Sequence, residues 1–275
     1  MPELPEVETI RRHLEVAMLG RTIKAARTHR ADLRRPFPPE LAARIKGRRI
    51  EKLDRRAKYL VIVLEDGLDL LIHLGMSGRI LIGPAEGKPG KHEHFTIDLD
   101  DGRRVSLHDP RRFGVVDLVL SAERERHPSL RDIGPEPLSK AFTGAVLHAA
   151  LKGSATSIKA ALLDQTRVAG LGNIYVCEAL FRSGISPKRP AGKVDLERAT
   201  KLAAAIKQVL QDALKAGGST LRDHRLPSGE LGYFQYNFDV YDREGLDCRN
   251  GHGKTLIKRI VQGGRSTFFC AVCQK

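Results

Sequence analysis

The stretch YLVIVLEDGLDLLIHL, residues 59–74, indicates how the first part of the chain folds. It contains two short apolar runs, 59–64 and 68–74, with Asp66-Gly67 between them. Asp-Gly between two such runs is typical of a tight β-hairpin turn, because both residues tolerate positive φ angles. The sequence therefore predicts two antiparallel strands joined by a short turn.

Further strand-like runs follow up to residue 120. They lie at 79–82, 95–99, 103–107 and 115–120. Asp101-Gly102 separates two of these runs and repeats the hairpin signal. We therefore predict that residues 1–120 form an antiparallel β-sandwich, or a flattened barrel, of roughly six to eight strands.

Apolar residues near the start of the chain predict a helix in the same domain. The residues that recur at helical spacing are Val7, Ile10, Leu14 and Met18. The pattern ends near Gly20, which is a common residue at a helix end. One N-terminal helix is therefore expected to pack against the sandwich.

The pattern changes after residue 120. Residues 121–138 combine prolines and charges without a clear period, which is typical of a linker. Helices are then expected at 139–151, 157–163, 173–182 and from Asp195 to the glycine pair at 217–218. The chain is therefore predicted to be an α+β protein with several domains.

The charge of the chain favours a polyanionic partner. Its 275 residues carry a net charge of +14. Neutralising phosphates with such a surface releases counterions, so a nucleic acid is the expected partner, although a ribosomal or membrane-surface role also fits the charge. We expect no membrane span and no signal peptide, and therefore a cytoplasmic, nucleoid-associated protein.

The cysteines predict a metal site rather than disulfides. Three of the four, Cys248, Cys270 and Cys273, lie in the last part of the chain, where two strand-like runs flank Gly263-Gly264. Two ligand pairs beside a hairpin are typical of a zinc ribbon, and His252 supplies the fourth donor in our interpretation. Cys177 is the alternative. A closed four-ligand site would hold one structural zinc ion.

The first eight residues, MPELPEVE, allow two interpretations. Removal of Met1 would leave the secondary amine of Pro2 free, and such an amine can attack an aldehyde to form a Schiff base. Alternatively, Pro2 and Pro5 only begin a helix. Similarly, the glycine-containing turn before Asn173 could present a helix N-terminus to a phosphate, or it could be a plain turn. These residues alone leave both questions open.

Eight blocks of sequence resemble the bacterial formamidopyrimidine-DNA glycosylases (the Fpg, or MutM, family), and they occur in the family's order. The blocks are MPELPEVETIRR (1–12), RRAKYL (55–60), HLGMSG (73–78), KHEH (91–94), DPRRFG (109–114), IGPEPL (133–138), GLGNIY (170–175) and GGRSTFFCAVCQK (263–275). The resemblance implies a catalytic β-sandwich domain at 1–120, a linker at 121–138, a helix-two-turn-helix DNA-binding domain at 139–235 and a zinc finger at 236–275.

The resemblance also implies the activity. The family excises 8-oxoguanine and formamidopyrimidines from double-stranded DNA and then cleaves the strand at the abasic site. Pro2 would be the nucleophile that forms the Schiff base, and Glu3 would transfer protons. Lys58 would act as the general acid in β-elimination, and Arg265 would stabilise phosphate charge during δ-elimination.

Seven further residues are expected to contact DNA by the same resemblance. Met76, Arg111 and Phe113 would fill the space left by the flipped base, with Arg111 bonded to the orphaned cytosine. The positions matched to phosphate contacts are His92, Ser154, Lys159 and Asn173. Ser154 stands near where the family often has a basic residue, so this contact is weakened or lost. The segment 221–233 resembles the loop that covers the flipped base.

Two other kinds of protein share some of these features. Endonuclease VIII shares the fold and the proline nucleophile but prefers oxidised pyrimidines, and the PELPEVE start together with Met76, Arg111 and Phe113 favours the purine enzyme. The second alternative is a zinc-ribbon protein that binds damaged DNA without cutting it. We expect a monomer, because one active site acting on one lesion requires no symmetry.

Overall fold

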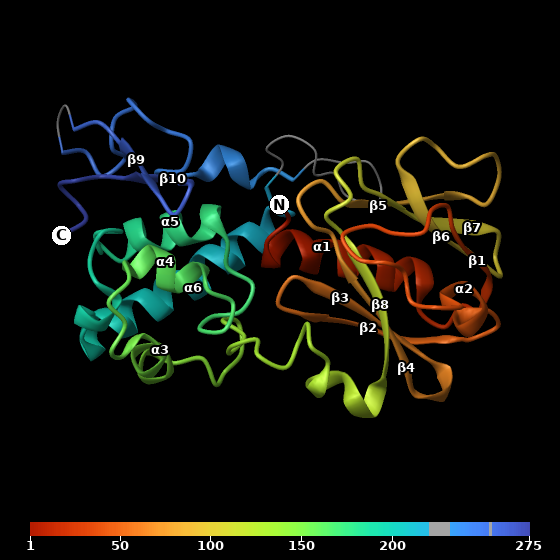
Figure 1. Cartoon of the computed structure of the whole chain (residues 1–275). Coiled ribbons are helices and arrows are strands. Elements are labelled where there is room, and N and C mark those ends of the chain that lie inside the picture. The colour runs from red at the N-terminus through yellow and green to blue at the C-terminus, as the bar shows by residue number, and fades with distance from the viewer. Residues whose placement is uncertain (220–231, 253–254) are drawn as a thin grey trace. The chain divides into compact units, whose positions relative to one another are not determined.

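The computed structural model describes residues 1–219, 232–252 and 255–275. The chain divides into two compact units, one formed by residues 1–131 with 216–233 and the other by residues 132–215 with 234–275 (Figure 1). The helical segment and the zinc hairpin therefore share one unit. The finer division at residues 120, 138 and 235 stays a prediction.

The first unit begins with helix α1 (Leu4–Met18). Pro5 lies in its first turn, where the backbone N–H that proline lacks would have no partner within the helix. Its apolar face, which includes Val7, Ile10 and Leu14, is buried, and the helix packs on the strands β2 (Ile50–Arg56) and β3 (Tyr59–Leu64). The predicted N-terminal helix and its buried face are confirmed.

This unit also contains two antiparallel four-stranded sheets (Figure 1). One has the order β2-β3-β4-β8 and the other the order β1-β6-β7-β5. The strands are β1 (Ile23–Thr28), β2 (Ile50–Arg56), β3 (Tyr59–Leu64), β4 (Leu68–His73), β5 (Arg79–Pro84), β6 (Glu93–Leu99), β7 (Arg103–His108) and β8 (Val115–Leu120). A single apolar core takes residues from both sheets and α1, which confirms the predicted β-sandwich.

The hairpins predicted at Asp66-Gly67 and Asp101-Gly102 are confirmed. Asp66 and Gly67 both have positive φ angles and join β3 to β4, and Gly102, also with a positive φ, lies between β6 and β7.

Strands β1 and β2 were not among the predicted runs. Strand β2, with the sequence IEKLDRR, buries only Ile50 and Leu53, which are three positions apart and do not alternate. Strand β1 has the weaker signal of the two. Its sequence, IKAART, buries only Ile23 completely, so it lacks the apolar alternation that identifies a strand.

The second unit contains the helices α3 (Gly144–Leu151), α4 (Ile158–Leu163), α5 (Asn173–Arg182) and α6 (Leu196–Lys215). Helix α3 starts later than predicted, because the Thr143 hydroxyl caps it by accepting the N–H of Val146. A side chain at Gly144 would clash with Thr200 of α6, so the glycine permits the close packing of these helices. Asn173 is the first helical residue of α5, and Gly172 occupies the cap position.

The unit ends in the predicted hairpin of β9 (Lys258–Gln262) and β10 (Arg265–Phe269). Gly263 and Gly264 both have positive φ angles, as a two-residue hairpin turn requires. Short elements complete the described chain: α2 (Leu41–Ile45), η1 (Glu65–Gly67), η2 (Ser121–Arg126), η3 (Ala191–Lys193) and η4 (Phe234–Asn237). Among the described residues, no helix combines the length and the apolar character that crossing a bilayer requires.

Candidate functional site

The predicted nucleophile and its neighbour lie at a fixed, buried start of α1. Pro2 and Glu3 are buried, and the Glu3 N–H donates to Glu6 Oε2 over 2.9 Å. The other oxygen of Glu6 accepts the backbone N–H of Ser219 at 2.9 Å and its hydroxyl at 3.0 Å. Chain ends usually fray unless they are tied down, and these bonds tie this one down.

Ser219 is also the last described residue before the segment expected to cover the flipped base. Residues 221–231 of that segment lie outside the described residues. The expectation for 221–233 therefore stays a prediction.

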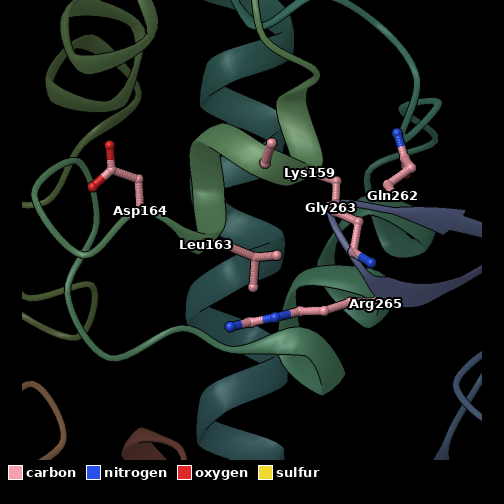
Figure 2. Close-up of a pocket in the computed structure, with 7 residues that line it drawn as sticks. Lys159, Leu163, Asp164, Gln262, Gly263 and Arg265 are labelled. Atoms are coloured by element: carbon pink, nitrogen blue, oxygen red, sulfur yellow. The ribbon is translucent and has the colours of Figure 1, made fainter.

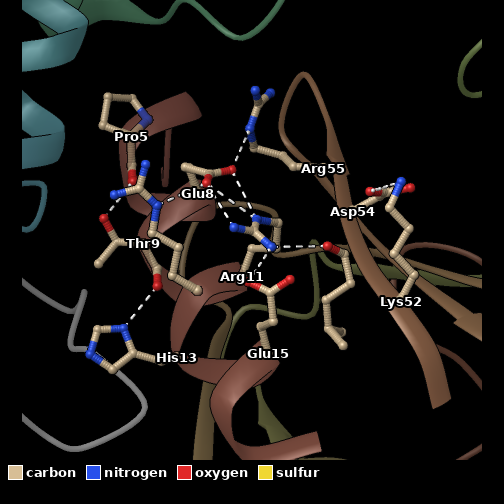
Figure 3. A network of polar contacts seen from close by, with 11 residues as sticks. Pro5, Glu8, Thr9, Arg11, His13, Glu15, Lys52, Asp54 and Arg55 are labelled. Carbon is tan, nitrogen blue, oxygen red and sulfur yellow. Dashed lines mark hydrogen bonds and ion pairs between the residues drawn. The ribbon is translucent and has the colours of Figure 1, made fainter. Parts of the chain in front are cut away.

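A network of charges connects α1 to β2 (Figure 3). Glu8 accepts hydrogen bonds from Arg11 at 3.2 Å, Arg12 at 3.0 Å and Arg55 at 3.3 Å. Burial alone would raise the pKa of Glu8, but these arginines outweigh it and lower that pKa below its usual value. Arg55 also donates to the carbonyl of Ala57 at 2.9 Å. The helix that begins beside Pro2 is thus bonded to the turn that carries Lys58.

Lys58 lies in the tight turn that joins β2 to β3. The turn consists of Ala57, whose φ is +51°, and Lys58, and the Arg56–Tyr59 pair closes it. The Lys58 side chain is buried. A buried lysine at a turn is held in one place, as a general acid requires.

His73 is a candidate site residue that the sequence analysis did not single out. Its ring lies 4.8 Å from that of Tyr59 between centroids, tilted by 45°, and its Nδ1 accepts the N–H of Gly75 at 3.1 Å. Burial, together with the positive charges of Lys58 and Arg34, lowers the pKa of His73 to about 4. A signal was available, because His73 is the first residue of the HLGMSG block.

The three residues expected to fill the space of the flipped base occur on two adjoining loops. Met76 is 44% exposed and Phe113 is 42% exposed, although both are large and apolar. The guanidinium carbon of Arg111 lies 4.8 Å from the centroid of the Phe113 ring. A Cβ on Gly75 would lie 2.4 Å from the carbonyl carbon of Phe113, so the two loops pack backbone to backbone. Exposed apolar side chains on rigid loops are suited to unstacking bases.

His92 lies at the base of the second of these loops. Its carbonyl accepts the N–H of Asp109 at 2.9 Å, and its ring is half-buried, 6.5 Å from the ring of His94. Its expected contact with a phosphate stays a prediction.

In the second unit, two predicted phosphate contacts point into the protein. The Lys159 ammonium is fully buried and donates to the Ser266 carbonyl at 2.9 Å and the Thr267 hydroxyl at 2.5 Å. Asn173 Nδ2 donates to the same Ser266 carbonyl at 2.9 Å. Burial lowers the pKa of Lys159, and the charge of Arg265 contributes. Both side chains therefore hold the residue that follows Arg265.

Arg265 itself is exposed at the start of β10 and borders a cavity of about 260 Å³. Figure 2 shows its side chain extending from the hairpin toward Leu163 of α4, with Asp164 on the far side.

Ser154 is half-buried, and its hydroxyl pairs with that of Thr156 at 3.0 Å. A serine hydroxyl carries no positive charge, in keeping with the weakened backbone contact expected there.

Three of the four predicted zinc ligands come together. The donor atoms of Cys248, His252 and Cys273 all lie within 4.8 Å of one another. The sulfurs of Cys248 and Cys273 are 3.6 Å apart, and Nε2 of His252 is 2.7 Å from the Cys273 sulfur. Cys270 is buried, and its thiol interacts with those of Cys248 and Cys273.

This donor set fits zinc, which binds thiolates and imidazole in tetrahedral sites. Cys177 is buried on α5 near the Lys159 ammonium, and in the part of the chain that the structure describes it is not a member of this cluster. The cluster is compatible with a structural zinc ion whose ligands include His252. Which residue supplies the fourth ligand stays a prediction.

Family models match three segments of the chain. Residues 1–116 match the formamidopyrimidine-DNA glycosylase N-terminal domain, residues 133–225 match the H2TH domain of the same enzymes, and residues 254–275 match a zinc finger found in FPG and IleRS. Together these matches cover most of the chain.

Individual relatives are similar over their full length. The chain is 53% identical to a formamidopyrimidine-DNA glycosylase of Cereibacter sphaeroides and 52% identical to one of Ruegeria pomeroyi, with 100% of each chain covered. Its structure is similar to MutM (Fpg) from Thermus thermophilus, with a TM-score of 0.88, 44% identity, and 99% and 98% of the two chains covered. It is also similar to Lactococcus lactis Fpg in complex with abasic-site DNA, with a TM-score of 0.91, 33% identity and 99% of both chains covered.

Proposed function

Because the chain belongs to the formamidopyrimidine-DNA glycosylase family, we propose that it excises oxidised purines through a Schiff base on Pro2 and cleaves the strand by β,δ-elimination. The observation that carries this proposal is the fixed, buried start of α1. A nucleophile must be held in line with the atom that it attacks. The bonds from Glu6 to Glu3 and to Ser219 supply this rigidity.

The chemistry begins once Met1 is removed. The Pro2 nitrogen attacks C1′ of the damaged nucleotide, the bond from C1′ to the base breaks, and the base leaves with a proton. Glu3 protonates the sugar ring oxygen as the ring opens. The resulting iminium is positively charged without further protonation, which makes the hydrogens on C2′ acidic.

Two eliminations then remove the sugar from the strand. Loss of a C2′ proton expels the 3′ phosphate, and a second elimination expels the 5′ phosphate, leaving a gap of one nucleotide. The Lys58 ammonium donates a proton during the first step. The Arg265 guanidinium, which stays protonated, stabilises the negative charge of the departing phosphate.

Recognition of the lesion requires the damaged nucleotide to leave the base stack. The exposed side chains of Met76 and Phe113 would occupy the space that it vacates, and Arg111 would bond to the orphaned cytosine. His92 is proposed to contact the DNA backbone, whereas the Asn173 amide holds the Ser266 carbonyl beside Arg265. The net charge of +14 supports binding of the duplex as a whole.

A trapping experiment tests the Schiff base. Protein whose Pro2 start is verified by intact mass is mixed with a duplex that contains an abasic site and is reduced with borohydride. A covalent adduct is expected with the parent protein, a strongly reduced adduct with Pro2→Gly, and an adduct without excision of 8-oxoguanine with Glu3→Gln. Absence of an adduct from the verified parent protein would exclude the Schiff-base mechanism and favour a protein that only binds damage.

Two further measurements complete the assignment. Defined duplexes with 8-oxoguanine or thymine glycol distinguish the purine enzyme from an activity like that of endonuclease VIII, because preference for thymine glycol contradicts the proposal. Light scattering of the free protein and of its DNA complex checks the proposed monomer. A dimer in both states would contradict it.

A further inference from the structure

A buried hydrogen bond joins the two loops that carry Met76, Arg111 and Phe113. The Ser77 hydroxyl donates to Asp109 Oδ1 at 2.6 Å. Asp109 is fully buried and Ser77 is 6% exposed. A buried carboxylate destabilises the folded protein unless it is hydrogen-bonded, so Asp109 requires the hydrogen bond from Ser77.

Both partners also hold the backbone around them. The second oxygen of Asp109 accepts the N–H of Gly114 at 2.7 Å, and the Ser77 hydroxyl accepts the N–H of Arg111 at 3.1 Å. The Asp109 carbonyl accepts the N–H of Arg112 at 3.1 Å. The backbone is thereby fixed on both sides of Phe113.

Close packing leaves little room for the loops to adjust. Arg112 has a φ of +59°, a left-handed conformation that is sparsely populated for residues other than glycine. A Cβ on Gly114 would lie 3.0 Å from Asp109 Oδ2, and one on Gly78 would lie 2.1 Å from the Leu74 carbonyl oxygen. The Ser77–Asp109 pair therefore lies in tightly packed backbone, and the same two loops carry the exposed side chains of Met76 and Phe113.

We propose that Ser77 and Asp109 are positioning residues for lesion recognition: they set where Met76, Arg111 and Phe113 enter the duplex without contacting it themselves. This inference rests on the proposed function of those three exposed residues. Losing the Ser77 hydroxyl leaves an unpaired oxygen on Asp109 and frees the Arg111 N–H, so the two loops shift relative to each other. A displacement of about 1 Å at a positioned group can reduce a rate by up to about 100-fold.

The effect depends on the substrate. An 8-oxoguanine nucleotide must be unstacked and unpaired. Met76, Arg111 and Phe113, here called the wedge, contribute to that step, whereas an abasic site has no base to extrude. Ser77→Ala is expected to reduce excision of 8-oxoguanine opposite cytosine by about 10-fold or more, while cleavage of a preformed abasic site changes by less than about threefold. Because Arg111 is also displaced, the preference for cytosine over adenine opposite the lesion should narrow.

The test measures both reactions in single turnover, together with a 2-aminopurine signal beside the lesion that reports base extrusion. Ser106→Ala is the matched control, since it removes another buried serine hydroxyl, one paired with His108 on β7. Ser77→Ala is expected to slow the change in 2-aminopurine fluorescence that reports base extrusion. The melting temperature of the Ser77→Ala protein should be similar to that of Ser106→Ala. Equal losses on both substrates, or no change on either, would overturn the positioning role.

Phe113→Ala separates this inference from the function on which it rests. If Phe113→Ala slows excision of 8-oxoguanine and Ser77→Ala does not, the positioning role is wrong and the wedge stands. If Phe113→Ala leaves excision and base extrusion unchanged, the wedge itself is wrong and the positioning role falls with it. Asp109→Asn, which keeps the shape of the side chain, is expected to lie between the parent and Ser77→Ala on all three readouts.

Discussion

The carboxylate of Glu8 on α1 accepts a hydrogen bond from Arg55 on β2 at 3.3 Å. Arg55 in turn donates to the carbonyl of Ala57, the residue before Lys58. The proposed nucleophile and the proposed general acid are far apart in the sequence. This ion pair links the helix that begins beside Pro2 to the turn that holds Lys58.

Breaking this pair should affect both stability and chemistry. Glu8→Gln is expected to lower the free energy of unfolding at pH 7 by about 1–2 kcal/mol, because three arginines lose their charged partner in a partly buried site. It should also slow borohydride trapping. Urea unfolding and trapping rates measure the two effects. Glu15→Gln, which removes a more exposed partner of Arg11, should change stability by less than about 0.5 kcal/mol.

The difference in the free energy of unfolding between the parent and Glu8→Gln should depend on pH. The pKa of Glu8 in the folded protein is below its ordinary value of 4.5. Its ionised form therefore stabilises the fold above that value, and the contribution is lost as the pH falls through the lowered pKa. The difference between the parent and Glu8→Gln should shrink in acid. A difference that grows below pH 4.5 would contradict this assignment.

His73 predicts a second pH dependence, in a higher range. Burial and the neighbouring charges of Lys58 and Arg34 lower its pKa from 6.5 to about 4. Between these values the unfolded chain binds the proton that the folded protein excludes, so stability falls as the pH drops, by up to about 1.4 kcal/mol per pH unit. Urea unfolding between pH 7 and pH 4 should show a weaker pH dependence for His73→Gln than for the parent. Parallel curves would rule out His73 as the source.

Lys159 and Arg265 should differ in how they affect DNA binding. Lys159 is buried against Ser266 and Thr267, so Lys159→Met should leave the salt dependence of binding nearly unchanged and reduce the δ-elimination product by displacing Arg265. Arg265→Ala should reduce the slope of log K against log salt by about 1, as expected for one lost phosphate contact. Binding titrations at several salt concentrations measure the slopes. A reduced slope for Lys159→Met would instead support the direct phosphate contact that its sequence position predicts.

The zinc cluster gives a metal-content prediction. The parent protein and Cys177→Ala should each contain one zinc per chain, and His252→Ala should lose most of it, because His252 lies with Cys248 and Cys273. Elemental analysis measures this. Chelation should destabilise the hairpin and with it the position of Arg265, so δ-elimination should decline before trapping at Pro2 does. Zinc retained in His252→Ala and lost in Cys177→Ala would reverse the ligand assignment.

The sequence by itself determined the features that depend on local periodicity and turn chemistry. The hairpin at Asp66-Gly67, the buried face of α1 and the turn at Gly263-Gly264 follow from which residues tolerate a positive φ and from which apolar residues recur. The motif blocks also indicated the family. Strand β1 escaped this reasoning, since a strand with one fully buried residue has no periodic signal, and it exists because β6 pairs with it.

Only the tertiary structure decided which partner each polar side chain meets. Lys159 and Asn173 carry the chemistry of phosphate contacts, yet both donate to the carbonyl of Ser266. Ser77 and Asp109 lie in separate motifs, and nothing in either motif indicates that they share a hydrogen bond. Such bonds depend on where distant loops meet, and that is set by the packing of the whole sheet, not by the order of residues within a loop.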